Sequence, residues 1–592
     1  MKRCYRLLIA ALALPLLGCR ATLPPPPEVP TALPSGLVPL KLGVFPVNTF
    51  HVLGYHDVLP SRAAVTEARD GLALPLPDLV QHFSWLRDNG HPVVSWDQVI
   101  ASRTGGAALP PGAVMLSFDD AYESFHSRVL PLLRLFNYPA TLAVVPRWIE
   151  EPAKGRIEYE IGRIGRARFM SWAQIQDAMG SGLVEIASHS YDSHYGHVGN
   201  PGGNKQPALV TRRFDLESKR YETDAEFSGR VRLDLQQSRE TLTDRLGKAP
   251  RVMVWPYGAH SDSVNAIAAS VGMPYSLTLD PGVNTPEVGL SHLRRDLIEL
   301  DTSTQDIEIA LRPRRVRTER VVSLDLAAMI ADTAGTEARL GALIERVLAM
   351  RPTLLVLTAQ AATPGEDAAK QSMPADAYFP TSAARTVADV ANRVAWQLRT
   401  RGGVRVFFEA PRGTGAASTL ALQNDLARQA AFAGFAFSES TEPGALSSAM
   451  AALRSHRGPV ESIRRFRYLG NCQDVDAERI GTLRTRLQRE AADADWILLN
   501  VSTEDGRACS LTWWQALRSA TQTLPIGSDQ IMIELNYRRN DHAQTALVDP
   551  LLTAYAGGFR HLAYTGDLYL EGLPEVATIR AAMSVDTHPT KR

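Results

Sequence analysis

Two short segments of this 592-residue chain carry side chains that could hold and use a metal ion. Asp119 and Asp120 stand side by side, and His189 and His194 follow further along the chain, five residues apart. A carboxylate with two imidazoles leaves coordination positions open, which a catalytic divalent ion needs in order to bind and activate water. The second carboxylate would be free to accept a proton. The pattern predicts a metal-dependent hydrolase with Asp120, His189 and His194 as ligands and Asp119 as general base.

Alternatives to these assignments stay open at this point. His197 lies three residues beyond His194 and competes with it as a ligand. Asp119 or Asp120 could also cap the helix expected to lead into Ser127–Phe136, a role that can coexist with catalysis. Mixed histidine and carboxylate ligands suit zinc, cobalt, nickel or iron, and the sequence does not choose among these metals.

Two further segments, Tyr55-His56 and Trp255-Pro256-Tyr257-Gly258, also follow apolar runs. His56 is predicted to be the general acid, because an amide nitrogen leaves only when it is protonated and histidine titrates near neutral pH. A single histidine at the end of a strand can instead be structural. The aromatic residues of the second segment could likewise belong to the hydrophobic core.

The elements that must position these residues alternate between strand and helix from Thr49 to about Leu300. Such an order predicts a parallel sheet of βα units with barrel-like closure, and barrel enzymes hold their sites at the carboxyl ends of the strands. The Asp pair and the two histidines fall at such ends. The predicted strands are Phe50–Tyr55, Val93–Val94, Ala113–Phe118, Thr141–Val145, Leu183–Ala187, Arg251–Trp255 and Tyr275–Leu279.

A second alternating series begins near Pro313 and predicts a second (β/α) barrel-like domain. The domains are therefore expected at residues 46–312 and 313–592. The polar segments Glu151–Arg168 and Tyr195–Asp224 are expected to be rim insertions that shape a substrate groove. Strands are predicted at Arg320–Leu324, Thr353–Thr358, Val404–Glu409, Phe435–Phe437, Trp496–Val501, Gln530–Leu535 and Arg560–Tyr564.

The amino terminus predicts export. Three basic residues precede an apolar run from Leu7 to Leu17, which is the order of a signal peptide over residues 1–18 and is too short to span a bilayer. The segment Leu16-Leu17-Gly18-Cys19 is typical of a bacterial lipobox, in which Cys19 is acylated. An ordinary signal peptide with a chance cysteine is the alternative. Because Arg20 replaces the aspartate that retains such proteins at the inner membrane, we expect an outer-membrane anchor facing the periplasm.

Composition limits the partners and the compartment. Residues 19–45 include four consecutive prolines and predict an extended spacer between anchor and domains. Lys+Arg and Asp+Glu balance at 63 each, which argues against nucleic acid as a partner and is compatible with a neutral or weakly cationic polysaccharide. Cys472 and Cys509 could pair in an oxidising compartment, but the sequence alone does not decide it.

The motifs also carry a family resemblance. Phe118-Asp119-Asp120, with His189-Ser190 and a second histidine, resembles the signature of the NodB-type polysaccharide deacetylases. With the early Tyr55-His56, the resemblance is to the PgaB-type poly-β-1,6-N-acetyl-D-glucosamine N-deacetylase lipoproteins, over roughly Phe45 to Arg312. It implies periplasmic, metal-dependent N-deacetylation of that polymer for exopolysaccharide export and biofilm formation, with an outer-membrane export porin as partner. Deacetylation of peptidoglycan, chitin-type or O-acetylated polysaccharides, and a non-enzymatic polysaccharide-binding export lipoprotein, are the alternatives.

The resemblance assigns roles within the Trp255–Gly258 segment. Tyr257 would supply a backbone N–H to the developing oxyanion, and Trp255 and Pro256 would help to bind the substrate. Many relatives carry an arginine two residues before the proline, whereas this chain has Val254. The group that orients Asp119 is therefore not identified by the motif.

The second domain resembles glycoside hydrolases but departs from their pattern. Phe437-Ser438-Glu439-Ser440 stands where an Asp pair is expected, which leaves Asp325, Glu409 and Glu439 as carboxylates. A glycosidase needs two placed carboxylates. We therefore expect this domain to bind or present the polysaccharide rather than to cut it.

Overall fold

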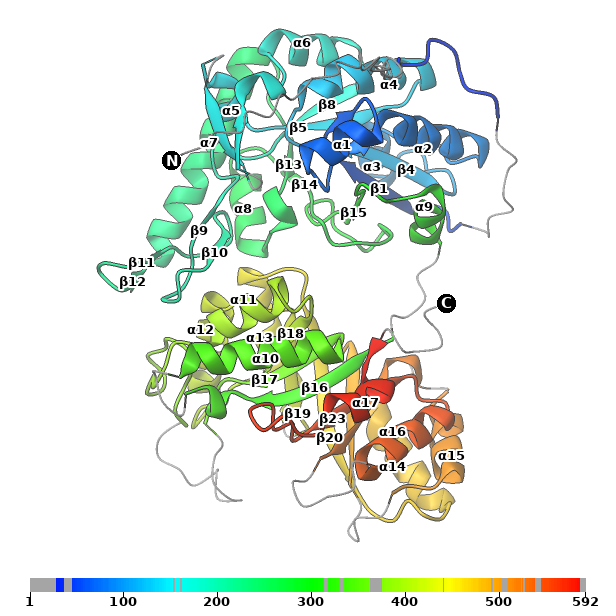
Figure 1. Ribbon diagram of the computed structural model, residues 1–592, viewed down its shortest axis with the longest axis vertical. Helices are drawn as coiled ribbons and strands as arrows, with labels where there is room; N and C mark the ends of the chain where they lie inside the picture. Colours follow the sequence, from blue (N-terminus) through cyan, green and yellow to red (C-terminus); the bar gives the residue numbers. More distant parts are fainter. Residues whose placement is uncertain are drawn as a thin grey trace, which may run out of the picture.

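The computed structural model contains two domains, one above the other along its longest axis (Figure 1). The signal segment, Cys19 and most of the spacer lie outside the described residues. The structure describes residues 28–36, 45–152, 155–159, 162–312, 318–330, 335–361, 375–439, 441–490, 493–502, 508–522, 524, 528–537 and 545–585.

The first domain is built on a seven-stranded parallel sheet of order β14-β13-β8-β5-β4-β1-β15. Thr278 N–H donates to the Leu293 carbonyl and Leu293 N–H to that of Ser276, so the residues entering β15 curl back to β14. The predicted barrel-like α/β architecture is thereby confirmed. The strands are β1 (Phe50–Tyr55), β4 (Ala113–Phe118), β5 (Ala140–Val144), β8 (Val184–Ser188), β13 (Val252–Val254), β14 (Tyr275–Leu277) and β15 (Asp296–Leu297).

One predicted strand of this domain is wrong. Val93 makes only an isolated bridge to Val114 and does not belong to a strand of the sheet. The helices around the sheet are α1 (Arg62–Ala68), α2 (Leu76–Asp88), α3 (Trp96–Arg103), α4 (Leu130–Phe136), α5 (Pro146–Glu150), α6 (Trp172–Gly180), α7 (Asp224–Leu246), α8 (Asp262–Ser270) and α9 (Thr304–Leu311).

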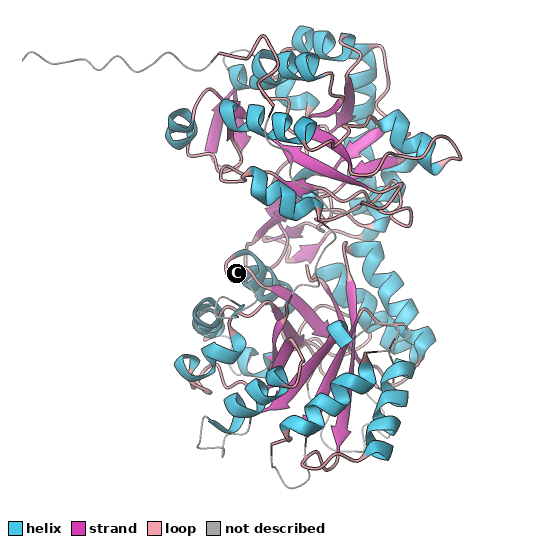
Figure 2. Ribbon diagram, turned by 90° about the vertical axis from the view of Figure 1, so that its right-hand side faces the viewer, coloured by secondary structure: helices cyan, strands magenta, loops and turns pink. Residues whose placement is uncertain are grey.

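The second domain is a closed barrel of eight parallel strands in chain order, enclosed by helices, as predicted (Figure 2). Its strands are β16 (Arg320–Asp325), β17 (Leu354–Thr358), β18 (Arg405–Glu409), β19 (Gly434–Ser438), β20 (Glu461–Leu469), β21 (Trp496–Ser502), β22 (Ile531–Asn536) and β23 (His561–Thr565). Its helices are α10 (Thr336–Met350), α11 (Ala391–Thr400), α12 (Ala416–Gln429), α13 (Pro443–His456), α14 (Ala477–Glu490), α15 (Leu511–Thr521), α16 (Thr545–Ala556) and α17 (Val576–Met583).

The second domain contains one strand that was not predicted and a disulfide that the sequence left open. β20 was not predicted, because its arginines interrupt the apolar run that marks the other strands. Cys472 and Cys509, whose pairing the sequence left open, form a disulfide with a Cα–Cα distance of 4.8 Å. It ties the loop after β20 to the loop before α15. Within the part of the chain that the structure describes, no helix is both long and apolar enough to cross a bilayer.

The polar segment Tyr195–Asp224 packs against the second domain. It carries the short strands β9 (Gly196–Val198), β10 (Lys205–Pro207), β11 (Phe214–Asp215) and β12 (Arg220–Tyr221), which face α11 to α13 (Figure 1). The amide of Asn392 donates to the Gly199 carbonyl and accepts from the Gln206 amide. The other predicted insertion contains the hairpin of β6 (Arg156–Tyr159) and β7 (Gly162–Gly165).

Candidate active site

Three side chains meet where the sequence predicts a metal site. Asp120, His189 and His194 are buried, and their ligand atoms all lie within 4.8 Å of one another. Asp120 Oδ1 is 3.6 Å from Nε2 of each histidine. Two ligand atoms that share a tetrahedral zinc ion at about 2.1 Å lie roughly 3.4 Å apart, so these residues fit a divalent ion.

The chain makes tight turns in order to deliver these groups. The Asp pair follows β4 and His189 follows β8, two parallel strands separated only by β5. Asp120 (φ 72°), Ser190 (φ 71°) and Tyr257 (φ 60°) adopt left-handed backbone conformations that are unfavourable for residues other than glycine. Such strain tends to cluster at functional sites, where the surrounding fold maintains it.

Both histidines are prepared to act as neutral ligands. His189 Nδ1 donates to the Val254 carbonyl at 2.6 Å, which leaves the Nε2 lone pair for an ion. Burial lowers the pKa of His189 to about 4 and that of His194 well below its ordinary value. The His194 ring packs against Trp148 and Tyr257, with ring centroids 5.0 and 4.7 Å away.

The competing assignments are resolved by position. His197 Nε2 bonds to the Thr211 carbonyl at 3.0 Å, outside the ligand cluster. The helical segment after the Asp pair begins at Glu123, so the residue directly before it is Tyr122 and not an aspartate.

Asp119 is oriented by Arg295, which the sequence analysis missed. Arg295 Nη1 donates to Asp119 Oδ1 at 2.6 Å, and both side chains are almost fully buried. The same guanidinium donates to Ser117 Oγ at 3.1 Å and, through Nε, to the Thr278 carbonyl at 3.0 Å. It passes over Gly54, where an added Cβ would lie 2.9 Å from Arg295 Cδ. No motif marks Arg295, because it reaches Asp119 from the segment that enters β15.

The two sides of the Asp119 carboxylate have different surroundings. Burial is the largest single influence and would raise the pKa of this carboxyl, but Arg295, His189 and His56 together outweigh burial and hold the pKa well below its usual range. Oδ2, on the other side, is 3.9 Å from Nε2 of both His56 and His189. Asp119 is therefore an ionised carboxylate whose second oxygen faces the proposed acid and one proposed ligand.

The remaining predicted residues differ in their exposure. His56 is close to Asp119, and burial lowers its pKa, so its imidazole is neutral at neutral pH. Tyr257 is partly exposed, and its backbone turns directly after β13. Trp255 and Pro256 are buried, and Trp255 packs in the core with Val264. Their predicted role in substrate binding stays a prediction.

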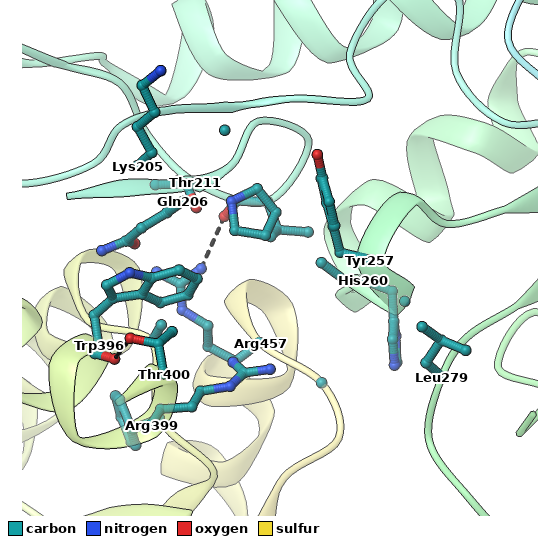
Figure 3. A pocket seen from close by; sticks show the side chains of 18 of the residues that line it. Lys205, Gln206, Thr211, Tyr257, His260, Leu279, Trp396, Arg399, Thr400 and Arg457 are labelled. Atoms are coloured by element: carbon teal, nitrogen blue, oxygen red, sulfur yellow. Dashed lines mark hydrogen bonds between the residues drawn. The ribbon is translucent and has the colours of Figure 1, made fainter. Parts of the chain in front are cut away.

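The candidate site opens between the domains. His194 and Tyr257 line a cavity of about 740 Å³ whose far wall comes from the second domain (Figure 3). His194 and Tyr195 also line a smaller cavity of about 250 Å³ beside Trp148. His194 is thus the predicted metal ligand that lines both cavities.

The barrel mouth of the second domain holds paired carboxylates. Arg465 on β20 forms ion pairs with Glu409 and with Glu534, a fully buried residue that the sequence analysis did not identify. Glu534 also accepts from Asn500 Nδ2 at 2.8 Å. Of the other predicted carboxylates, Asp325 accepts from the Ala327 N–H and Glu439 pairs with Arg486.

Comparison with known proteins gives the relatives of each half. Residues 106–276 match the family model "Polysaccharide deacetylase", and residues 323–412 match "Hypothetical glycosyl hydrolase family 13". The chain is 33% identical over 371 residues to the poly-β-1,6-N-acetyl-D-glucosamine N-deacetylase of Escherichia coli K12, covering 62% of this chain and 53% of the relative. The chain thus spans about half the length of the curated relatives it matches.

Solved structures of deacetylases are also similar. A de-N-acetylase from Aggregatibacter actinomycetemcomitans is 35% identical, covering 44% of this chain and 99% of that chain, with a TM-score of 0.41. The BpsB deacetylase domain from Bordetella bronchiseptica is 42% identical, covering 42% of this chain and 96% of that chain, with a TM-score of 0.39. The resemblance based on the Asp pair and the histidines is confirmed: residues 106–276, within the domain that carries this site, match the polysaccharide deacetylase family.

Proposed function

We propose that this protein is a metal-dependent N-deacetylase of poly-β-1,6-N-acetyl-D-glucosamine. The observation that carries the proposal is the ionised Asp119 beside the three-residue cluster of Asp120, His189 and His194. The curated relatives named for this polymer support the choice of substrate. A binding lipoprotein without catalysis would not need a buried carboxylate held in its ionised form by a buried arginine.

The residues of this chain divide the reaction between them. A divalent ion, when bound, would polarise the acetyl carbonyl and lower the pKa of a water molecule. Arg295 fixes Asp119 Oδ1, so Oδ2 is the oxygen that accepts the proton of the attacking water. The Tyr257 N–H, presented by the turn after β13, would donate to the developing oxyanion.

His56 completes the proton transfer. Its Nε2 lies 3.9 Å from Asp119 Oδ2, which accepts the proton, and its imidazole is neutral before reaction. His56 can therefore take up that proton and pass it to the departing sugar amine. The His56→Ala variant should slow amide cleavage more than cleavage of an activated acetate ester, whose leaving group needs no proton. If the rates of amide and ester cleavage fall equally in this variant, His56 is not the general acid.

The substrate assignment is tested with oligosaccharides. Release of acetate should be measured from β-1,6-linked and β-1,4-linked N-acetylglucosamine oligomers, from peptidoglycan fragments and from an O-acetylated sugar. We expect the β-1,6 linkage to be preferred, and a chelator to abolish turnover until zinc, cobalt, nickel or iron is restored. Faster acetate release from another substrate would mean that the polymer assigned here is not the preferred substrate. Full activity in the presence of chelator would reject the metal-dependent mechanism.

We also propose that the protein is an outer-membrane lipoprotein facing the periplasm, where it acts in exopolysaccharide export and biofilm formation beside an export porin. The lipobox that ends at Cys19 supports the anchor, and the proline-rich segment supports a spacer. Cys19→Ala should release the folded protein from the membrane fraction. A variant that stays in that fraction would place the anchor elsewhere.

The second domain is proposed to bind the partly deacetylated polymer without cutting it. The ion pairs of Arg465 with Glu409 and Glu534 support this view, because a glycosidase needs carboxylates free to act as acid and as base or nucleophile. The full-length protein should leave the length of deacetylated polymer unchanged. Shortened products that disappear in Glu439→Gln or Asp325→Asn would show hydrolysis instead.

A further inference from the structure

The cavity between the domains has aromatic surfaces on both of its sides. Tyr195, directly after the ligand His194, is 46% exposed. From the second domain, α11 contributes the partly exposed Trp396, and the guanidinium of Arg399 lies 5.9 Å from its ring centroid. Figure 3 shows Trp396 and Tyr257 on different sides of the space, contributed by different domains. The apolar C–H faces of pyranose rings pack well on such exposed aromatic faces.

The charged groups of this cavity are mainly cationic. Lys205, Arg399 and Arg457 line it, whereas Asp280 is the one carboxylate among its described lining residues. Asp280 is already bonded to His260 Nε2 at 2.9 Å. Arg457 donates to the carbonyls of Val210, Ala430 and Arg428 and so meets no carboxylate in these bonds. A protonated amino sugar entering this space would face net repulsion.

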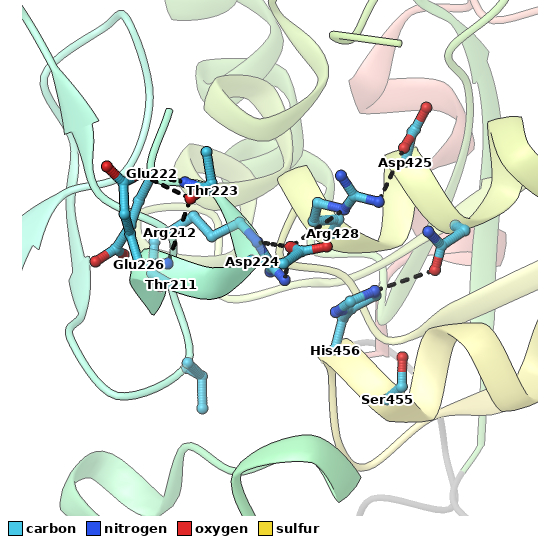
Figure 4. A network of polar contacts seen from close by, with 12 residues as sticks. Thr211, Arg212, Glu222, Thr223, Asp224, Glu226, Asp425, Arg428, Ser455 and His456 are labelled. Carbon is cyan, nitrogen blue, oxygen red and sulfur yellow. Dashed lines mark hydrogen bonds and ion pairs between the residues drawn. The ribbon is translucent and has the colours of Figure 1, made fainter. Parts of the chain in front are cut away.

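The cavity wall from the second domain is held in place at the start of α11. Asn392 bonds to Gly199 and Gln206, and Arg393 donates to the Gly202 carbonyl at 2.9 Å. A second set of contacts joins Asp224 to Arg212 at 2.6 Å and to Arg428 at 3.8 Å (Figure 4). Trp396, in the middle of α11, and Arg399, near its end, are therefore fixed relative to the loop that carries His194.

We propose that this interdomain cavity is a saccharide subsite that holds still-acetylated units of the polymer next to the deacetylase centre. Trp396 is the stacking platform, and the cationic wall around Arg399 disfavours units that have already lost their acetyl groups. The inference rests on the proposed function. It adds that the enzyme prefers substrate in which the neighbouring sugars are still acetylated. Because Trp396 comes from the second domain, this subsite forms only when both domains are present.

Kinetics on oligomers of different length test the platform. In the full chain, Trp396→Ala should raise KM for a β-1,6-linked N-acetylglucosamine pentamer about tenfold, because an aromatic stacking contact is lost. The kcat, and the hydrolysis of a small acetate ester, should not change, and Trp396→Phe should restore most of the affinity. Trp172→Ala is the matched control, since Trp172 is partly exposed on α6 and does not line the cavity.

Equilibrium binding tests the charge preference without turnover. With chelator present, calorimetry on the full chain should show the acetylated pentamer binding about tenfold more tightly than the fully deacetylated one. Arg399→Glu should abolish this difference, whereas Arg401→Glu, an exposed arginine just beyond α11 that does not line the cavity, should preserve it.

The outcomes separate the subsite from the proposed function. An unchanged KM for the pentamer in Trp396→Ala, or equal binding of the two pentamers to the unmodified protein, would overturn the subsite while leaving deacetylation intact. Absence of acetate release from every oligomer would reject the proposed function. In that case the preferential binding measured in chelator, and its loss in Arg399→Glu, would still support the subsite.

Discussion

At Asp119, two opposing influences act on one carboxyl group. Burial favours its neutral form, and Arg295 together with His189 and His56 favours its charged form more strongly. The result is a buried carboxylate that stays ionised. Since Arg295 donates to Asp119 Oδ1, the direction of the carboxylate is set from 176 residues away.

Replacing Arg295 should separate the orientation of the base from metal binding. In Arg295→Lys the single ammonium cannot keep all three hydrogen bonds of the guanidinium, so kcat should fall while the metal content stays. The pKa of Asp119 should rise, because its nearest cation is displaced, and the acid limb of the kcat/KM profile should therefore move to higher pH. Arg294→Lys is the control at the neighbouring position. An unchanged acid limb would mean that Arg295 has no influence on the base.

The ligands and the base should respond differently to substitution. Asp120→Ala, His189→Ala and His194→Ala should each lose bound metal and activity together. Asp119→Asn should keep the metal but lower kcat by about 10²–10⁴-fold, because the attacking water then lacks its base. Metal content by mass spectrometry, measured beside acetate release, distinguishes the two classes. If one of the three alanine variants retains a full complement of metal, the replaced residue is not a metal ligand.

Among the elements, strands made of continuous apolar runs could be predicted from sequence, and β1 and β4 have the predicted bounds. The proximity of the Asp pair and His189 could also be predicted, because each follows a strand of this kind. β20 could not be found in this way, because its Arg465 is acceptable inside the barrel only through Glu409 and Glu534 on other strands. Arg295 was missed on the same grounds: its role depends on a long-range contact that no local pattern encodes.

The Arg465 ion pairs give a stability test for this barrel. Arg465→Met should lower the free energy of unfolding by about 3 kcal/mol, since Glu534 is fully buried and would lose its cation. The double variant with Glu534→Gln should recover most of this loss, because an amide can still bond to Asn500 and Ser323. Urea unfolding of the full chain measures both effects. Arg467→Met, at an exposed position of the same strand, should be nearly neutral.

At the scale of the whole molecule, the domains meet through polar groups, and one of these groups titrates. Tyr221 on β12 donates to Asp389 Oδ2 at 2.7 Å, just before α11. Burial of this carboxyl raises its pKa to about 6. The folded protein thus favours the protonated form, so the associated stability is fully present below about pH 4 and is lost as the pH rises through about 6.

Asp389→Asn should remove this dependence while keeping an oxygen that accepts from Tyr221. We expect the variant to gain about 1–2 kcal/mol relative to the unmodified protein on going from pH 4 to pH 7.5. Urea unfolding at several pH values measures the difference. Asp474→Asn, an exposed position in the same domain, serves as control. Parallel pH profiles for Asp389→Asn and the unmodified protein would show that this carboxyl does not titrate with folding.

The loop after His194 has a consequence that extends beyond the reaction. One end of this loop carries the predicted metal ligand His194, and its continuation at Gly199, Gly202 and Gln206 is bonded to α11 of the second domain. When domain contact stabilises the ligand-holding shape of the loop, thermodynamic linkage requires the ion to strengthen domain contact by the same free energy. A bound ion would then strengthen the contact between the domains, and protein deprived of metal should open first at this interface.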